Sequence, residues 1–247
     1  MNRCVFLGYR PAERMKNLYW YAKEKLEALY EQIREESRHT LLNGGCPDDF
    51  LLHPENDTRM SVTLLFRIPA EISRRIEGML RQLASYCPGL YVYPPSDMHV
   101  TVLDILRGRP GLQKPEHAEA DGYIECIRSA LNGSPPFRVL FRGVTVSDSA
   151  LLVCGYYEEP LARIRHVIRS GLRKAGLLLE ERYETYSCHI TVARFPVRIT
   201  DPQAFLALTE RYREANFGSC VIRELEYTYH NWYDSRKETL SRFCLPS

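Results

Sequence analysis

The stretch "MHVTVLDIL", residues 98–106, sets a histidine and a threonine two positions apart in a largely apolar run. Successive side chains of a β-strand point to opposite faces, so His99 and Thr101 share one face while Val100 and Val102 share the other. Such a strand buries its aliphatic face and presents an imidazole and a hydroxyl on the opposite surface. The pattern therefore predicts a strand with one face packed in the core and the other face carrying two polar side chains that can take part in a reaction.

The stretch "CHITVARF", residues 188–195, repeats the same device ninety positions later. His189 and Thr191 are on one face of the predicted strand, and Ile190 and Val192 are on the other. If the two strands face each other across a cleft, two imidazoles and two hydroxyls converge on one small volume.

These four groups suit a phosphodiester. Imidazole titrates near neutrality, so one histidine can accept a proton while its charged twin donates one. Threonine hydroxyls can donate hydrogen bonds to the non-bridging phosphate oxygens. We therefore predict a metal-independent enzyme whose catalytic residues are His99, His189, Thr101 and Thr191. No cofactor and no metal are expected, since two histidines with two threonines make a poor zinc site.

Strand and helix patterns alternate around the two motifs. Strands are predicted at 61–68, 90–94, 98–106, 136–147, 150–157, 188–195, 220–231 and 239–245, and body helices at 69–86, 116–131, 160–176 and 201–215. Each half of the chain thus carries a strand, a helix and a motif strand. This order favours an α+β fold with mainly antiparallel sheets. No glycine-rich phosphate loop follows any predicted strand.

The first part of the chain has a different character. Apolar residues at helical spacing predict a helix over residues 11–40, and "NGGCPDDFLLHPENDT", residues 43–58, then breaks the pattern. We therefore divide the chain into an N-terminal helical extension with its loop, residues 1–57, and a main domain, residues 58–247.

Composition narrows the possible partners and location. The 247 residues include 33 basic and 31 acidic side chains, and a net charge of +2 argues against bulk electrostatic binding of nucleic acid. No DNA partner is expected, whereas a local phosphate site remains compatible. Eight scattered cysteines without a CxxC pair are typical of reduced thiols. Together with the lack of a long apolar run, they predict a cytoplasmic protein without a membrane partner, and we expect a monomer.

The paired motifs resemble those of the two-histidine phosphoesterase superfamily, which includes LigT-like 2′,5′-RNA ligases and cyclic nucleotide phosphodiesterases. "HITVARF" is similar to the second motif of that family, which often ends in an arginine, here Arg194. "MHVTVLDIL" is similar to the first, although the family often has Phe-Leu-Gly where this chain has Asp104-Ile105-Leu106. The resemblance covers about residues 58–247 and leaves the helical segment outside it, as in a divergent member.

The resemblance implies a bilobal fold with pseudo-twofold symmetry, in which two mainly antiparallel sheets face a central cleft and the helices lie outside. It also implies acid–base cleavage of a cyclic (2′,3′ or 1″,2″) or 2′,5′-linked nucleotide or RNA-end phosphodiester, in which His99 and His189 exchange protons. We expect His99 to be the acid and His189 the base, an order that the sequence does not decide. Three alternatives stay open: a non-catalytic module that binds a phosphate or RNA end, 2′,5′-RNA ligation in the reverse direction, and an interaction protein that acts through its N-terminal helix and has a vestigial site. Further substrate-binding candidates are Arg194, Arg107, Tyr229, His230 and Tyr233.

Overall fold

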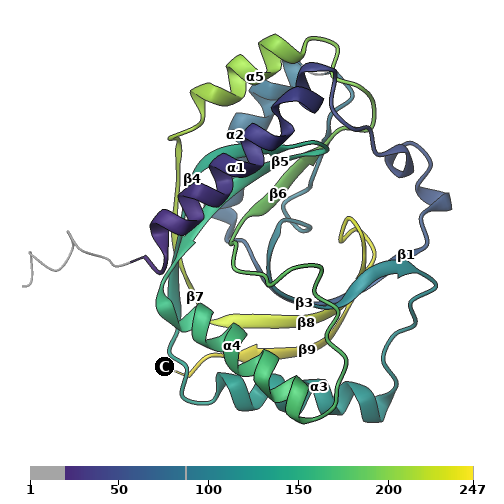
Figure 1. The fold of residues 1–247 in the computed structure, drawn as a ribbon, viewed down its shortest axis with the longest axis vertical. Coiled ribbons are helices and arrows are strands. Elements are labelled where there is room, and N and C mark those ends of the chain that lie inside the picture. Colours follow the sequence, from purple (N-terminus) through teal and green to yellow (C-terminus); the bar gives the residue numbers. More distant parts are fainter. Residues whose placement is uncertain (1–19, 87, 247) are drawn as a thin grey trace, which may run out of the picture.

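A computed structural model describes residues 20–86 and 88–246, and it contains two antiparallel sheets with helices outside them (Figure 1). Sheet A has the strand order β3-β1-β8-β9, and sheet B has the order β2-β6-β5-β4-β7. The strands are β1 (Arg59–Arg67), β2 (Tyr91–Val92), β3 (His99–Pro110), β4 (Phe137–Ser147), β5 (Ala150–Tyr157), β6 (Ile190–Arg194), β7 (Asn216–Ile222), β8 (Glu224–Asn231) and β9 (Lys237–Cys244). The predicted α+β, bilobal architecture is confirmed.

The described residues form five helices, which cover the outer faces of the sheets. They are α1 (Lys23–Leu42), α2 (Ala70–Tyr86), α3 (His117–Leu131), α4 (Glu159–Lys174) and α5 (Pro202–Arg211), with the short turns η2 (Asp49–Leu51) and η3 (Pro54–Asn56) after α1. Helix α2 follows β1 of sheet A but contacts β7 and α5 on the sheet B side. Conversely, α4 follows β5 of sheet B and contacts β3 and α3. Each motif strand therefore returns to its own sheet after a helix that packs on the other lobe.

Several predicted boundaries differ from the structure, and three of them bear on the position of the motif strands and of the last strands. The segment predicted as one strand over 220–231 is two strands, because the chain leaves sheet B after Ile222 and enters sheet A at Glu224. Strand β3 continues to Pro110 and so extends beyond the predicted end at residue 106, since its last residues pair with the start of β1. Strand β6 begins at Ile190, which puts His189 just before the ladder.

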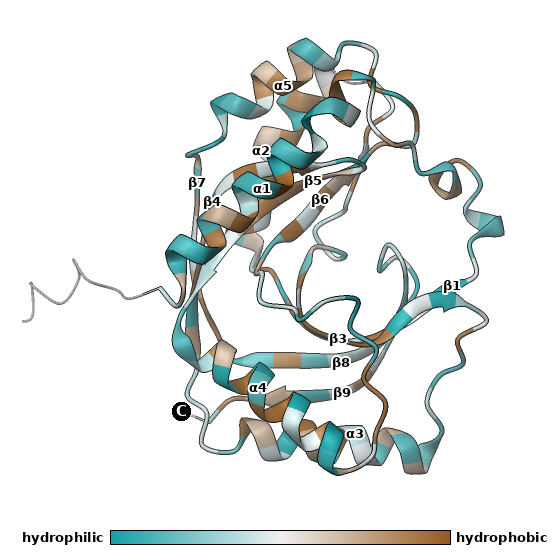
Figure 2. Ribbon diagram, viewed as in Figure 1, coloured by the Kyte–Doolittle hydropathy of each residue, from teal (hydrophilic) through white to brown (hydrophobic). Residues whose placement is uncertain are grey.

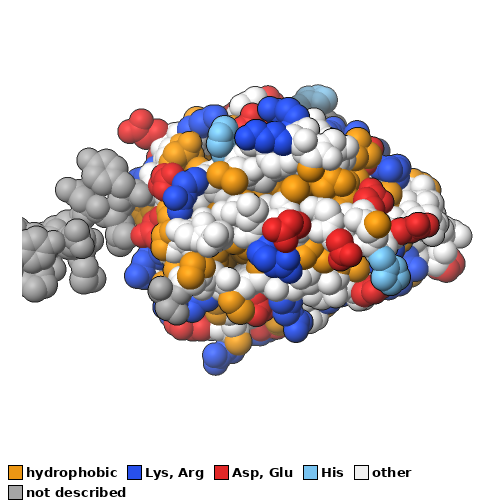
Figure 3. All heavy atoms as spheres, turned by 90° about the horizontal axis from the view of Figure 1, so that it is seen from below, with side chains coloured by type: hydrophobic (Ala, Val, Ile, Leu, Met, Phe, Trp, Pro, Cys, Tyr) orange, Lys and Arg blue, Asp and Glu red, His pale blue; other side chains and the backbone are white. Residues whose placement is uncertain are grey.

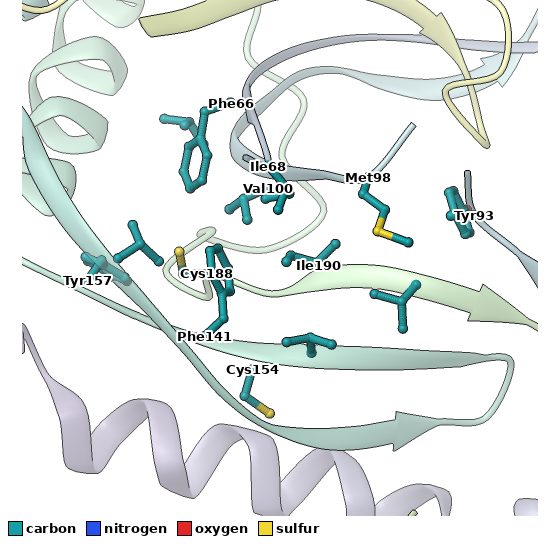
Figure 4. Packing of buried hydrophobic residues seen from close by; sticks show 14 of the residues in the cluster. Phe66, Ile68, Tyr93, Met98, Val100, Phe141, Cys154, Tyr157, Cys188 and Ile190 are labelled. Atoms are coloured by element: carbon teal, nitrogen blue, oxygen red, sulfur yellow. The ribbon is translucent and has the colours of Figure 1, made fainter. Parts of the chain in front are cut away.

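The core continues from one lobe into the other. As the alternation predicts, Val100, Val102, Ile190 and Val192 are fully buried, and all four belong to one hydrophobic cluster (Figure 4). Strands β3 and β6 are in contact. The hydropathy of the ribbon shows the same division, with long hydrophobic stretches in the strands of sheet B and alternating faces on the helices (Figure 2). Burial of the aliphatic faces therefore sets the two motif strands against each other.

Helix α1 braces sheet B. The helix predicted at 11–40 is present from Lys23 to Leu42, and positions 11–19 lie outside the described residues. Its Tyr30 hydroxyl donates to the Gly155 carbonyl (3.0 Å) and accepts from the Cys188 backbone N–H (3.2 Å). Through these bonds α1 holds the segment that leads into His189. The division of the chain at residue 57 stays a prediction.

The outer surface carries charges of both signs. On the face shown in Figure 3, basic and acidic side chains are interspersed with hydrophobic ones instead of forming one basic field. Over residues 20–86 and 88–246, no helix combines the length and apolarity needed to cross a bilayer.

Candidate active site

A cleft of about 580 Å³ contains all four motif side chains. His99 and Thr101 line it from β3 of sheet A. Thr191 lines it from β6 of sheet B, and His189 lines it from the position just before β6. The valine and isoleucine between them point into the core, as described above. The strand alternation thus brings two imidazoles and two hydroxyls to one volume, from positions ninety residues apart.

His99 is oriented by the backbone and lies near a carboxylate. Its Nδ1 lies 2.8 Å from the Asp97 carbonyl oxygen, which can only accept, so Nδ1 carries the proton and Nε2 is left for the cleft. The Asp234 carboxylate is 3.9 Å from the same Nδ1. Burial lowers the pKa of His99, and Asp234 opposes this effect by favouring the charged ring.

His189 has a different electrostatic environment. Its Nδ1 lies 3.2 Å from the Ser187 hydroxyl. Burial lowers the pKa of His189 to about 4, and His99, Arg165 and Arg194 add to the shift because each is a positive neighbour. No carboxylate offsets these effects in the part of the chain that the structure describes. His189 is therefore held neutral, whereas His99 has a negative partner.

The buried Arg165 ties the two motif strands together. From α4 its Nε donates to the Val102 carbonyl (2.7 Å), and its Nη2 donates to the carbonyls of Thr101 (3.1 Å) and Ser187 (2.7 Å). Only 1% of Arg165 is exposed. One guanidinium thus fixes β3 relative to the residue two positions before His189. Sequence patterns indicate a plain basic surface for this helix, because nothing local shows that one of its arginines turns inward.

Three of the five further substrate-binding candidates line the cleft. They are Arg194, Arg107 and His230. Tyr229 and Tyr233 are not among its described lining residues. Tyr229 donates its hydroxyl to the Leu112 carbonyl (2.7 Å), and Tyr233 is buried against Arg59, whose Nη2 lies 3.0 Å from the Tyr233 hydroxyl.

The indole of Trp232 is the exposed aromatic surface of the β8–β9 turn. It lines the cleft with 38% of its surface accessible. Gly108 of β3 lies directly beneath it, since a Cβ built there would come within 3.0 Å of Trp232 Cε3. The Arg194 guanidinium is 5.7 Å from the ring centroid. The missing side chain at Gly108 therefore makes room for the ring in the cleft lining.

Two acidic residues near the cleft were missed as site residues by sequence reasoning. Asp104 lines the cleft on the same side of β3 as Thr101, and burial raises its pKa to about 6, with Glu181 adding to the shift. Asp234 lies fully buried behind His99. The β8–β9 turn carries Asp234 to His99 from a distant part of the sequence, so no local sequence pattern indicates that Asp234 lies near the cleft. Among the described residues, no group of three or more histidine, cysteine or acidic side chains is arranged to hold a metal ion.

Comparison with known proteins agrees with this geometry. A family model described as the 2′-5′ RNA ligase superfamily matches residues 68–226, which include both motifs. The chain belongs to this superfamily, which supports an activity of the phosphoesterase type. No curated protein matches the chain.

Solved structures show the same fold at low sequence identity. TT0787 of Thermus thermophilus has a TM-score of 0.56 at 16% identity, covering 76% of this chain and 97% of that one. Apo LigT of E. coli has a TM-score of 0.53 at 13% identity, covering 77% and 99%. LigT of E. coli complexed with 3′-AMP has a TM-score of 0.52 at 15% identity, covering 77% and 99%. The LigT-like fold is thereby confirmed.

Proposed function

We propose that the protein is a metal-independent phosphodiesterase that cleaves a cyclic or 2′,5′-linked nucleotide or RNA-end phosphodiester. The observation that carries the proposal is the convergence of His99, Thr101, His189 and Thr191 on one cleft. Two titrating groups and two hydroxyls supply an acid, a base and phosphate donors in one place. The superfamily match and the 3′-AMP complex of E. coli LigT support a nucleotide substrate.

The unlike surroundings of the two imidazoles support a division of roles. His189, held neutral among positive groups, is the base, and His99, which lies beside the Asp234 carboxylate, is the acid. On a 2′,3′-cyclic phosphate, His189 takes a proton from the attacking water as the new P–O bond forms. His99 gives its proton to the ribose oxygen as the old P–O bond breaks. The hydroxyls of Thr101 and Thr191 donate to the non-bridging oxygens.

The nucleoside would lie in the part of the cleft that Trp232 lines. There the Trp232 ring offers a stacking surface, which is worth about 1–3 kcal/mol per base in single-strand binders. Arg194 and Arg107 lie on the same cleft and would hold further phosphate or base oxygens. Asp104 adds a carboxyl to the lining of the same cleft, which would suit a sugar hydroxyl or an exocyclic amine.

The test is a product-resolved assay with 2′,3′-cyclic nucleotides and 2′,5′-dinucleotides, run with the wild-type protein and with His99→Ala and His189→Ala. Each variant is expected to lose about 10²–10⁴ in rate while keeping its thermal midpoint near that of the wild type. His53→Ala is the matched control, because the His53 side chain is 66% exposed and is not among the cleft-lining residues. Activity is expected to persist in EDTA.

Unchanged turnover in both variants, or complete loss of activity with the chelator, would overturn the proposal. Phosphate-dependent thermal stabilisation with no product from any substrate would instead favour the binding module. Formation of a 2′,5′ bond from a cyclic phosphate and a free hydroxyl would favour the ligase direction.

A further inference from the structure

A buried carboxylate at the back of the cleft faces two imidazoles at once. Asp234 lies in the β8–β9 turn, is 0% exposed and has φ 58°, a left-handed conformation in which aspartate is several-fold enriched. Its Oδ2 lies 3.9 Å from His99 Nδ1 and its Oδ1 lies 3.4 Å from His230 Nδ1. One carboxylate therefore presents one oxygen to each of two histidines, which come from different strands of sheet A.

Both rings are locked in the same tautomer. His230 Nδ1 lies 2.9 Å from the Asn231 carbonyl oxygen, just as His99 Nδ1 lies 2.8 Å from the Asp97 carbonyl oxygen. Since a carbonyl only accepts, each Nδ1 carries a hydrogen and each Nε2 is the basic atom. The rings meet edge to face with centroids 5.8 Å apart, and both line the cleft. His230 Nε2 is 3.3 Å from the Ser61 hydroxyl.

The two oxygens of Asp234 have different partners. Oδ2 accepts from the Arg67 guanidinium and from Lys237 Nζ (3.0 Å). Oδ1 is buried and accepts no hydrogen bond from the described residues. A buried acceptor without a donor is costly, so Oδ1 stabilises a positive charge on the ring that faces it. The other charged or titratable groups around these three residues are Asp97, Glu226, Tyr93 and His189.

We propose that His99, Asp234 and His230 form one proton-holding unit, in which the carboxylate stabilises a single extra proton that either of the two cleft-lining imidazoles can carry on its Nε2. Asp234 is the positioning residue of this unit. Two imidazolium rings at this separation repel each other, so one ring is neutral whenever the other is charged. For the reaction, the inference rests on the proposed function: the acid is then the pair of rings and not His99 alone. After His99 donates its proton to the leaving oxygen, the unit recovers one proton from solvent through either ring.

The electrostatic directions agree with this arrangement. Burial lowers the pKa of His230 to about 4 with His99 as the next cause, while Asp234 acts in the opposite direction on both rings. Burial raises the pKa of Asp234, but His99, Arg67 and His230 together outweigh it and hold that pKa below its usual value.

The test is an NMR titration of the histidine rings in the ¹⁵N-labelled full chain without substrate, in the wild type and in two variants. In Asp234→Asn the pKa of both rings is expected to fall by about one unit or more, because their negative neighbour is lost. In His230→Gln the pKa of His99 is expected to rise, because the shared proton has only one ring left. The shifts have opposite signs, which a merely structural role would not produce. His53→Gln serves as the matched control and leaves both rings unchanged.

The inference is overturned if the pKa of His99 stays the same in His230→Gln or falls in both variants. Asparagine keeps the shape of Asp234 and tolerates its backbone conformation. It removes one of the two carboxylate partners of Arg67 and of Lys237, which keep Glu226 and Asp97 respectively. If Asp234→Asn does not fold, the direction of the shift in His230→Gln decides. Because this readout needs no turnover, a shared proton without phosphodiesterase activity would reject only the proposed function.

Discussion

At the scale of single residues, the two motif histidines have charged neighbours of opposite sign. His189 lies among His99, Arg165 and Arg194, whereas His99 lies 3.9 Å from the Asp234 carboxylate. Desolvation acts on both rings, so the difference between them comes from their charged neighbours. Identical motifs can thus carry unlike roles without any difference in the motif itself.

These fields predict an acidic pH optimum for kcat/KM, which reports the free enzyme. The base must be neutral, so activity is lost as pH falls through the His189 pKa of about 4. The acid must be protonated, so activity is lost as pH rises through the His99 pKa, which lies below its usual 6.5. The residual activity of His189→Ala should lack the limb near pH 4. A profile that still rises above pH 7 would contradict the assignment.

At the scale of elements, the β8–β9 turn does more than close a hairpin. It carries Trp232 at the cleft surface, Tyr233 in the core and Asp234 behind His99. Consecutive residues of the turn therefore supply a possible stacking surface, packing and charge. The position of the indole depends on β3, because Gly108 leaves the space that the ring occupies.

Substitution Gly108→Ala tests this contact. The added Cβ would lie 3.0–3.1 Å from the Trp232 ring, which must shift. In a Trp20→Phe background Trp232 is the sole tryptophan, and we expect 3′-AMP but not inorganic phosphate to change its fluorescence. Gly108→Ala should weaken 3′-AMP binding by up to about tenfold and leave phosphate binding unchanged.

Gly78→Ala is the control for this substitution, because only a distant Arg81 side-chain atom (3.9 Å) lies near its new Cβ. If 3′-AMP and phosphate changed the fluorescence equally, the base of 3′-AMP would not stack on Trp232.

At the scale of the whole molecule, the cleft exists because two lobes are held at a set distance. The shared core does much of this, and Arg165 adds hydrogen bonds to three backbone carbonyls from both motif segments. The crossing of α2 and α4 onto the opposite lobe has the same effect.

We expect Arg165→Met to lower the free energy of unfolding by about 3 kcal/mol or more, since each buried carbonyl left without a donor costs about 1–3 kcal/mol. The measurement is urea unfolding followed by circular dichroism. Arg173→Met, at an exposed position of the same helix, should change it by no more than about 0.5 kcal/mol. If both variants were equally stable, Arg165 would not join the lobes.

The sequence by itself determined the elements that local periodicity encodes. The alternation of side chains along a strand predicted that Val100 and Ile190 lie in the core and that the motif side chains lie on the opposite face. Both expectations hold in the structure. The paired motifs also predicted the superfamily, which the family match confirms. At Arg223 the chain passes from sheet B to sheet A, but the strand-like pattern continues through this position. The prediction of one strand over residues 220–231 was therefore wrong.

Only the tertiary structure decided what surrounds the histidines. Arg165 meets the Val102 carbonyl across 63 positions of the chain, and Asp234 meets Arg67 across 167. Such contacts depend on how helices cross the sheets and how a turn folds back, and neither leaves a periodic trace in the sequence. The charge on each imidazole follows from these distant neighbours, because electrostatic interactions depend on distance in space and on burial.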